Sequence, residues 1–138
     1  MVEAGAGEAA YHADADYEEK GARVVDRAAA YQADVVVKVQ PPTDDEIGLL
    51  NQGGVLIGFL APLDRPDVAE KLAAQGVTAL SMELVPRISR AQKMDALSAM
   101  SSLGGYKAVL VAAAELPKFF PLLTTAAGTV RPLSLIHI

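Results

Sequence analysis

The chain has 138 residues, of which 51% are hydrophobic and 21% are charged, and it contains no cysteine. This composition is typical of a globular domain or part of one, and it excludes an intrinsically disordered chain, a disulfide framework and a thiolate metal site. The formal net charge is -5, with lysines and arginines scattered among carboxylates, which argues against nucleic acid as a partner because phosphate binding needs clustered cations.

Two apolar windows, residues 47–63 and 103–116, fall short of the roughly 20 apolar residues that a helix needs to cross a bilayer. Glycines and polar residues interrupt the first window, and Lys107 interrupts the second. No basic segment followed by an apolar stretch opens the chain, so we expect no signal peptide. Contact with a membrane is therefore expected only through a partner.

The first motif along the chain is a glycine-rich stretch at residues 5–10, with the sequence GAGEAA. It matches the letters of the dinucleotide fingerprint G-x-G-x-x-A, which binds pyrophosphate only where a strand delivers the glycines to the N-terminus of a helix. No strand is expected before these glycines, and Glu8 would place a negative charge beside the phosphates. We interpret the stretch as a plain glycine-rich loop, followed by a short helix over residues 14–20 that stops at Gly21.

Three short apolar runs, rich in β-branched residues, follow at regular intervals, at residues 34–39, 54–60 and 77–82. They are near-continuously apolar, which is typical of parallel strands covered by helices on both faces. Two helices are predicted between them. Thr43, followed by Glu46, has the form of a capping box for a helix that ends near Leu50, and the second helix covers residues 66–75, with proline in its first turn.

This order of strands and helices predicts the α/β class: a Rossmann- or flavodoxin-like parallel sheet with flanking helices, incomplete at both ends. We expect a first strand-and-helix unit to belong before Val2 and a new strand to belong after residue 132. In parallel sheets, ligands bind beyond the carboxyl ends of the strands. Three segments occupy such positions, at residues 38–41, 60–63 and 83–90, and the third has the most unusual composition.

After the third segment the pattern becomes one long helix near the C-terminal part, over residues 91–116, which Pro117 ends. The pair Gly104 and Gly105 predicts either a break in this helix or close packing against another element, and we favour close packing. A further helix is predicted over residues 119–127. We interpret the tail, residues 133–138, as a translated sequencing-adapter artefact and leave it out of the fold.

The third segment also carries the candidate site. Arg87, Gln92 and Asp95 place a fixed cation, an amide and a carboxylate on one loop at the end of a strand. A guanidinium can pair with pyrophosphate oxygens, while amide and carboxylate groups can bind ribose hydroxyls or a carboxamide. Ser98 follows Asp95 at the spacing of one helical face. From the residues alone, a solvated loop with local caps and ion pairs explains the segment equally well.

The string PRISRAQKMDALS at residues 86–98, followed by GYKAV at 105–109, resembles the signature of the α subunit of proton-translocating nicotinamide nucleotide transhydrogenases. The similarity continues at residues 36–42, 56–63 and 119–129 and covers residues 2–132. It implies that residues 1–132 form part of an alanine dehydrogenase/transhydrogenase N-terminal domain. Residues 91–132 would then lead into an NAD-binding Rossmann domain that this chain lacks.

The same resemblance implies roles for the site residues. Arg87, Gln92 and Asp95 would contact NAD(H) and set its nicotinamide against the NADP(H) of a partner domain, and Ser98 would contact a ribose or amide. No metal is implied. The implied partners are membrane-embedded and NADP(H)-binding domains or subunits and a second α subunit in a homodimer. The implied location is the cytoplasmic side of the bacterial inner membrane, where hydride transfer is coupled to proton translocation.

Two alternatives stay open. Alanine dehydrogenase, a soluble NAD-dependent relative, has a catalytic histidine where this chain has Ala61, and keto-acid chemistry needs a group that titrates near neutral pH. Lys38 matches a position that binds substrate carboxylate in those enzymes, although a strand-end lysine is as good an interpretation, and we leave it out of the catalytic set. The other alternative is an inactive, isolated α/β fragment that binds a partner or nothing.

Overall fold

A computed structural model describes residues 1–134 of the chain. The chain divides into two compact units, of which the first comprises Met1–Asp95 and the second begins at Ala96. Residues 135–138 lie outside the described residues, and with them His137 and most of the tail that we interpret as an adapter artefact.

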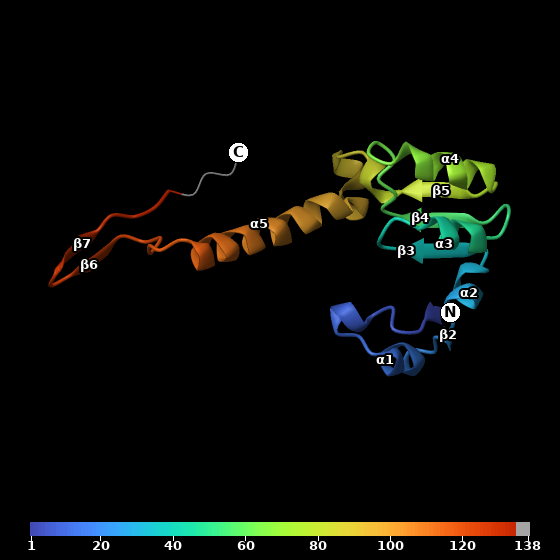
Figure 1. Cartoon of the computed structure of the whole chain (residues 1–138), viewed down its shortest axis with the longest axis horizontal. Coiled ribbons are helices and arrows are strands. Elements are labelled where there is room, and N and C mark those ends of the chain that lie inside the picture. The colour runs from blue at the N-terminus through green and yellow to red at the C-terminus, as the bar shows by residue number, and fades with distance from the viewer. Residues whose placement is uncertain (135–138) are drawn as a thin grey trace. The chain divides into compact units, whose positions relative to one another are not determined.

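The first unit is built on a parallel sheet in the order β3-β4-β5 (Figure 1). Its strands are β3 (Val35–Lys38), β4 (Val55–Gly58) and β5 (Thr78–Ser81). Leu56 on the central strand pairs with Val36 on one side and with Ala79 on the other. All three strands lie inside the predicted apolar runs, so the predicted α/β class is confirmed.

Two helices connect these strands, α3 (Asp44–Leu49) and α4 (Pro66–Ala74). The predicted capping box is confirmed: the Thr43 hydroxyl accepts from the Glu46 amide at 3.3 Å, and the Thr43 amide donates to the Glu46 carboxylate at 2.8 Å. Pro66 lies in the first turn of α4, as predicted. The sequence therefore predicted both helices and their starts correctly.

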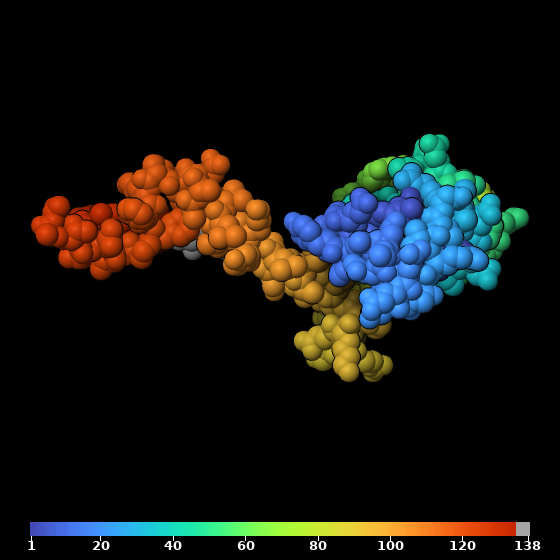
Figure 2. All heavy atoms as spheres, turned by 90° about the horizontal axis from the view of Figure 1, so that it is seen from below, coloured from blue at the N-terminus to red at the C-terminus, as the bar shows by residue number. Residues whose placement is uncertain are grey.

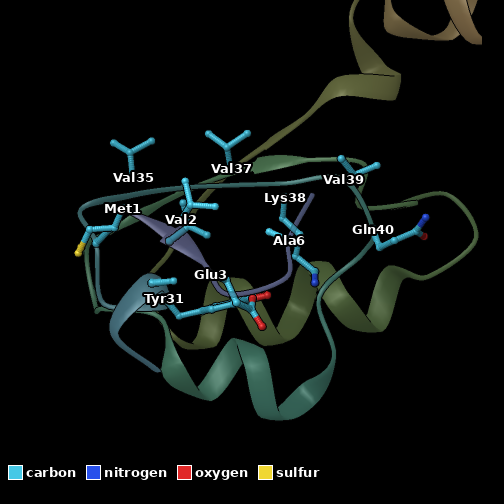
Figure 3. A pocket seen from close by; sticks show the side chains of 13 residues that line it. Met1, Val2, Glu3, Ala6, Tyr31, Val35, Val37, Lys38, Val39 and Gln40 are labelled. Atoms are coloured by element: carbon cyan, nitrogen blue, oxygen red, sulfur yellow. The ribbon is translucent and has the colours of Figure 1, made fainter. Parts of the chain in front are cut away.

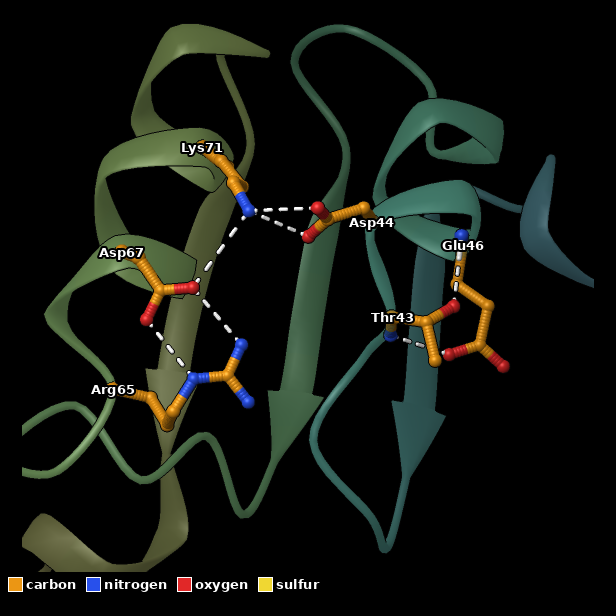
Figure 4. A network of polar contacts seen from close by, with 6 residues as sticks. All are labelled: Thr43, Asp44, Glu46, Arg65, Asp67 and Lys71. Atoms are coloured by element: carbon orange, nitrogen blue, oxygen red, sulfur yellow. Dashed lines mark hydrogen bonds and ion pairs between the residues drawn. The ribbon is translucent and has the colours of Figure 1, made fainter.

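Surface ion pairs link the two helices (Figure 4). Lys71 of α4 lies 2.7 Å from Asp44 of α3 and 3.7 Å from Asp67, which also pairs with Arg65 at 2.9 Å. The hydrogen bond from Arg65 is the main cause that lowers the pKa of Asp67 to about 2. Because these side chains are exposed and screened by water, the pairs contribute little to stability.

The core lies between the sheet and these two helices, and its fully buried side chains are Leu56, Val68 and Leu72. The chain steps in one direction from β3 to β5, so right-handed connections place both helices on the same face. Val36 faces them and is 8% exposed, whereas Val35 and Val37 are 52% and 76% exposed and point away (Figure 3). The expected cover by helices is therefore present on one face of the sheet only, among the residues that the structure describes.

The N-terminal part of the first unit holds a second, smaller parallel sheet, in which β1 (Val2–Glu3) pairs with β2 (Val24–Val25). The predicted short helix is confirmed as α1 (Asp14–Glu19), while α2 (Arg27–Tyr31) and both strands were not predicted. Strands of two residues are too short to show an alternating pattern. In Figure 2 these residues form the blue part of the surface.

The glycine-rich stretch forms a three-residue 3-10 helix, η1 (Glu8–Ala10), and not the first turn of an α-helix. The Gly5 amide donates to the Asp14 carboxylate at 2.9 Å, so a protein carboxylate occupies one of the amides that a pyrophosphate would need. A short strand, β1, does precede the glycines, contrary to the sequence expectation. The geometry nevertheless agrees with a glycine-rich loop.

The second unit contains α5 (Ala96–Glu115), which begins later than predicted because residues 89–94 form a separate 3-10 helix, η3 (Ser89–Met94). The helix continues through Gly104 and Gly105, and a Cβ atom at either position would have no neighbour within 4 Å. The predicted close packing is therefore wrong for the described residues. Two interior glycines cost a helix roughly 2 kcal/mol, which a run of twenty residues can tolerate.

The helix predicted over residues 119–127 is wrong. The segment forms an antiparallel hairpin of β6 (Leu123–Thr125) and β7 (Gly128–Val130). Pro121 interrupts the backbone hydrogen bonds that a helix would need, and the β-branched Thr124 and Thr125 favour a strand. Gly128 has a φ of 133°, a conformation open to glycine at the tight turn.

By length and composition, α5 is also apolar enough to cross a membrane, which the sequence windows did not indicate. Core helices of soluble proteins meet the same criterion, so the observation is weak. None of its residues is buried within the described chain.

Replacing Leu56 by alanine should destabilise the first unit by about 2–5 kcal/mol, because the change leaves a cavity in the core between β4 and the helices. Leu63→Ala is the matched control, since Leu63 is 85% exposed and Leu56 is fully buried. Urea unfolding followed by circular dichroism measures both changes. Equal losses in the two variants would contradict the core described above.

Candidate functional site

The carboxyl ends of β3, β4 and β5 lie at one edge of the sheet, because all three strands are parallel. Beyond β5 the chain forms a short 3-10 helix, η2 (Met82–Leu84), before it reaches the predicted site segment. Gly58, the last residue of β4, leaves no room for a side chain: a Cβ atom there would lie 2.2 Å from the carbonyl oxygen of Lys38. The edge at which the segment begins is thus closely packed.

Glu83 holds this edge together. Its Oε1 atom accepts hydrogen bonds from the amides of Leu60, at 2.8 Å, and Ala61, and its Oε2 atom accepts from the Ser81 hydroxyl at 2.6 Å. One carboxylate therefore joins the end of β5 to the loop that follows β4. Ala61 has a φ of 50°, a left-handed conformation that costs energy for a residue with a side chain, and the bond to Glu83 helps to hold it.

The charge of Glu83 is stabilised by these bonds. Burial acts to raise the pKa of its carboxyl, but the hydrogen bonds from Ser81 and from backbone amides, including those of Leu60 and Ala61, outweigh burial and lower the pKa. The sequence analysis placed Glu83 in the site segment without giving it a role. The available signal was a carboxylate directly after an apolar strand, where an unpaired charge would be costly.

The predicted binding residues follow this anchor. Arg87 and Gln92 are exposed and Asp95 is half-buried, and all three belong to the first unit. Gln92 lies on η3, where the neighbouring Ala91 is only 6% exposed and so ties the 3-10 helix to the unit. Ser98 is exposed and lies on α5, in the second unit.

This arrangement leaves the donors of Arg87 and Gln92 exposed on a segment that is anchored at both ends, by Glu83 and by Ala91. Figure 2 shows the dark yellow segment around residue 90 projecting from the surface. An exposed guanidinium and an exposed amide suit the binding of a dinucleotide, and they also suit the solvated loop that the sequence left open. The assignment of binding roles to these residues therefore stays a prediction.

Lys38, which the sequence analysis left out of the catalytic set, has a structural contact at the end of β3. Its Nζ atom lies 3.0 Å from Oε1 of Glu46 and 5.8 Å from the centre of the Tyr31 ring. Burial acts to raise the pKa of Glu46, but hydrogen bonds from Thr43, Lys38 and Tyr31 outweigh it and lower the pKa to about 2. Lys38 therefore ties β3 to the first turn of α3.

A cavity of about 550 Å³ lies beside β3, between this strand and residues near the N-terminus (Figure 3). Neither Arg87, Gln92, Asp95 nor Ser98 lines it. The described residues contain no group of three or more histidine, cysteine, aspartate or glutamate side chains that could hold a metal ion. The predicted site thus lies on an exposed segment and not in this cavity.

Known proteins resemble the chain along most of its length. The family described as alanine dehydrogenase/PNT, N-terminal domain, matches residues 1–104. An NAD(P) transhydrogenase subunit alpha polypeptide of Rhodospirillum rubrum is 46% identical over 139 residues, which cover 96% of this chain and 36% of that polypeptide. The crystal structure of a transhydrogenase from Sinorhizobium meliloti has a TM-score of 0.87 and 44% identity, over 95% of this chain and 40% of that one.

A solved L-alanine dehydrogenase is also similar, with a TM-score of 0.58 and 34% identity over 61% of this chain and 24% of that one. The similarity to transhydrogenases is thus higher and covers more of the chain. In every case this chain spans well under half the length of the relative that it matches.

Glu83→Gln should destabilise the first unit by roughly 1–3 kcal/mol at pH 7, because two backbone amides and a hydroxyl lose a charged acceptor. The pKa of Glu83 is lowered in the folded state from 4.5, so its stabilisation is complete above that pH and is lost as the pH falls through the folded pKa. Urea unfolding at pH 7, 4 and 3 should therefore show a difference between parent and variant that shrinks with acidification. Glu70→Gln, at an exposed position of α4, is the control, and a pH-independent difference for Glu83→Gln would contradict this role.

Proposed function

The chain belongs to the alanine dehydrogenase/PNT N-terminal domain family, and on this premise we propose that it is part of the NAD(H)-binding component of a proton-translocating transhydrogenase. The complete protein would transfer hydride between NAD(H) and NADP(H) and couple this transfer to proton translocation. The observation that carries the proposal is the exposed Arg87 and Gln92 on a segment that Glu83 anchors at the carboxyl edge of the sheet.

The donor set of this segment fits a nicotinamide dinucleotide. The Arg87 guanidinium can bind pyrophosphate oxygens in a bidentate way, and the Gln92 amide can donate to and accept from a ribose or carboxamide. Asp95 adds an acceptor for hydroxyl groups at the end of η3. NADH, when bound, supplies the hydride.

The role of the chain's own residues in this proposal is positioning. The anchor at Glu83 limits the movement of the segment that carries Arg87 and Gln92, so that these side chains hold a bound dinucleotide in one orientation. Holding reacting atoms in near-attack geometry can contribute several kcal/mol to a rate. Ser98, on α5, would add a ribose or amide contact.

A soluble alanine dehydrogenase is the weaker alternative. The position at which such enzymes resemble this chain but carry a catalytic histidine is Ala61, whose backbone amide binds Glu83. A methyl side chain cannot exchange a proton, whereas transfer of hydride between two nicotinamides needs no proton donor at this position. His12 lies in the loop before α1, and the other histidine is outside the described residues.

The proposal includes partners. The relatives named as transhydrogenase subunits suggest that this component works with membrane-embedded and NADP(H)-binding domains or subunits, as a peripheral domain on the cytoplasmic side of the bacterial inner membrane. We also propose that the complete α subunit forms a homodimer. Hydride would then pass between nucleotides held on different domains.

Arg87→Ala or Gln92→Ala in the complete α subunit, assembled with its partners, should slow hydride transfer at least about tenfold while the Kd for NADH changes less than about threefold, because a lost positioning contact acts mainly on the rate. Stopped-flow transfer assays and fluorescence titration measure the two quantities. Lys93→Ala is the matched control, since Lys93 is exposed on the same 3-10 helix and is not in the predicted set. Unchanged transfer rates for Arg87→Ala and Gln92→Ala would rule out the assignment.

This chain of 138 residues should not bind NADH tightly by itself, because it spans only 36% of the Rhodospirillum rubrum polypeptide and the proposal assigns some of the dinucleotide site to a further domain. Isothermal titration calorimetry with NADH tests this. Tight binding to the chain alone would mean that the whole dinucleotide site lies within these residues. Reduction of pyruvate with ammonia and NADH by the complete protein would instead support alanine dehydrogenase.

A further inference from the structure

Two strand edges of the first unit line the same cavity. On one side lie Met1, Val2 and Glu3, which include strand β1, and on the other lies β3 (Val35–Lys38). Among the described residues, β1 pairs only with β2, and β3 pairs only with β4. We call the cavity of about 550 Å³ between these two edges the strand slot.

The backbone of β3 faces the strand slot at alternate residues. The Val55 amide donates to the carbonyl oxygen of Asp34, so the backbone groups of Asp34 and Val36 face β4. In an extended strand, successive residues direct their N–H and C=O groups to opposite sides. The N–H and C=O groups of Val35 and Val37 therefore face away from β4, toward the strand slot.

The backbone of β1 faces the slot in the same way. The amides of Val2 and Ala4 donate to the carbonyl oxygens of Arg23 and Val25, at 2.9 Å each, on the side of β2. The amide of Glu3, which lies between them, therefore points away from β2. Figure 3 shows Met1 near Val35 and Ala6 near Lys38, so that the two edges run in the same direction.

Such a pair of edges is unusual. Parallel sheets are normally continuous and buried, and a sheet of two short strands is not stable alone. Edge strands that present free donors and acceptors are sites at which another strand can add. The strand slot offers such an edge on both sides, and the side chains along it are mainly apolar, including Met1, Val2 and Val35.

We propose that the strand slot holds an extended apolar strand, parallel to β1 and β3, contributed by the portion of the α-subunit polypeptide that this chain does not span. The added strand would join the β1-β2 and β3-β4-β5 sheets into one parallel sheet. The chain spans 36% of the Rhodospirillum rubrum polypeptide, so most of that polypeptide lies outside the match and can supply the strand. The proposal does not depend on hydride transfer.

A small anionic ligand suits the strand slot less well. The one lysine that lines it, Lys38, already pairs with the Glu46 carboxylate at 3.0 Å. Glu3, which also lines the slot, adds a second carboxylate, paired with Arg27 at 2.8 Å. The slot therefore has no excess of positive charge, and its backbone edges are its main unused binding groups.

The test uses this chain and ten-residue synthetic peptides that cover the portion of the Rhodospirillum rubrum polypeptide outside the match. Amide hydrogen exchange of Glu3, Val35 and Val37 is followed by NMR, with the amide of Leu56 as an internal reference within the sheet. We expect one apolar peptide to slow exchange at the slot-facing amides at least about tenfold and to leave Leu56 unchanged. A scrambled peptide of the same composition should have no effect.

Two variants separate backbone pairing from loss of folding. Val37→Pro removes a slot-facing N–H and leaves the donors toward β4 in place, so it should abolish peptide binding, whereas Val37→Thr keeps that N–H and should still bind. Circular dichroism checks that both variants are folded.

Three outcomes would overturn the proposal: no peptide protects the amides, the scrambled peptide protects them equally, or they are protected without peptide in a dimer detected by sedimentation. The last result would assign the strand slot to a second copy of the chain. Unchanged peptide binding by folded Val37→Pro would also contradict pairing along β3.

Discussion

The parallel pairing of β3, β4 and β5 is the constraint on which the rest of the first unit depends. Parallel neighbours need connections that cross the sheet, and the two helical connections, α3 and α4, supply the apolar side chains that bury Leu56. The same pairing brings the three carboxyl ends to one edge. Glu83 can therefore reach from the end of β5 to the amides that follow β4, although 22 positions separate it from Ala61.

That carboxylate links the fold to the proposed function. A charged acceptor with three donors is well stabilised when half-buried, and it fixes the start of the segment that carries Arg87 and Gln92. Burial of Ala91 fixes the segment again near its middle. Side chains that bind a dinucleotide need such a rigid base, because positioning is their whole contribution. The same edge carries Ala61, which separates this chain from the dehydrogenases in its family.

Sequence patterns predicted the regular elements of the fold well. The three apolar runs became strands, and the capping box at Thr43 began α3 as expected, because these signals depend on neighbouring residues only. The wrong predictions have different causes. Residues 119–127 are apolar enough for a helix, but Pro121 and two threonines favour the hairpin. The pair Gly104 and Gly105 indicated close packing, which depends on a neighbouring element and cannot be read from one helix.

By itself, the sequence determined the α/β class, the helix starts and the family, through local patterns and the string at residues 86–98. Only the tertiary structure decided that Glu83 anchors the site segment, that Lys38 pairs with Glu46, and that one face of the sheet and the strand slot are open. These features join residues far apart in the chain or depend on which strands become neighbours. Strand order and register are set by the packing of the whole unit, and no short stretch of sequence contains that information.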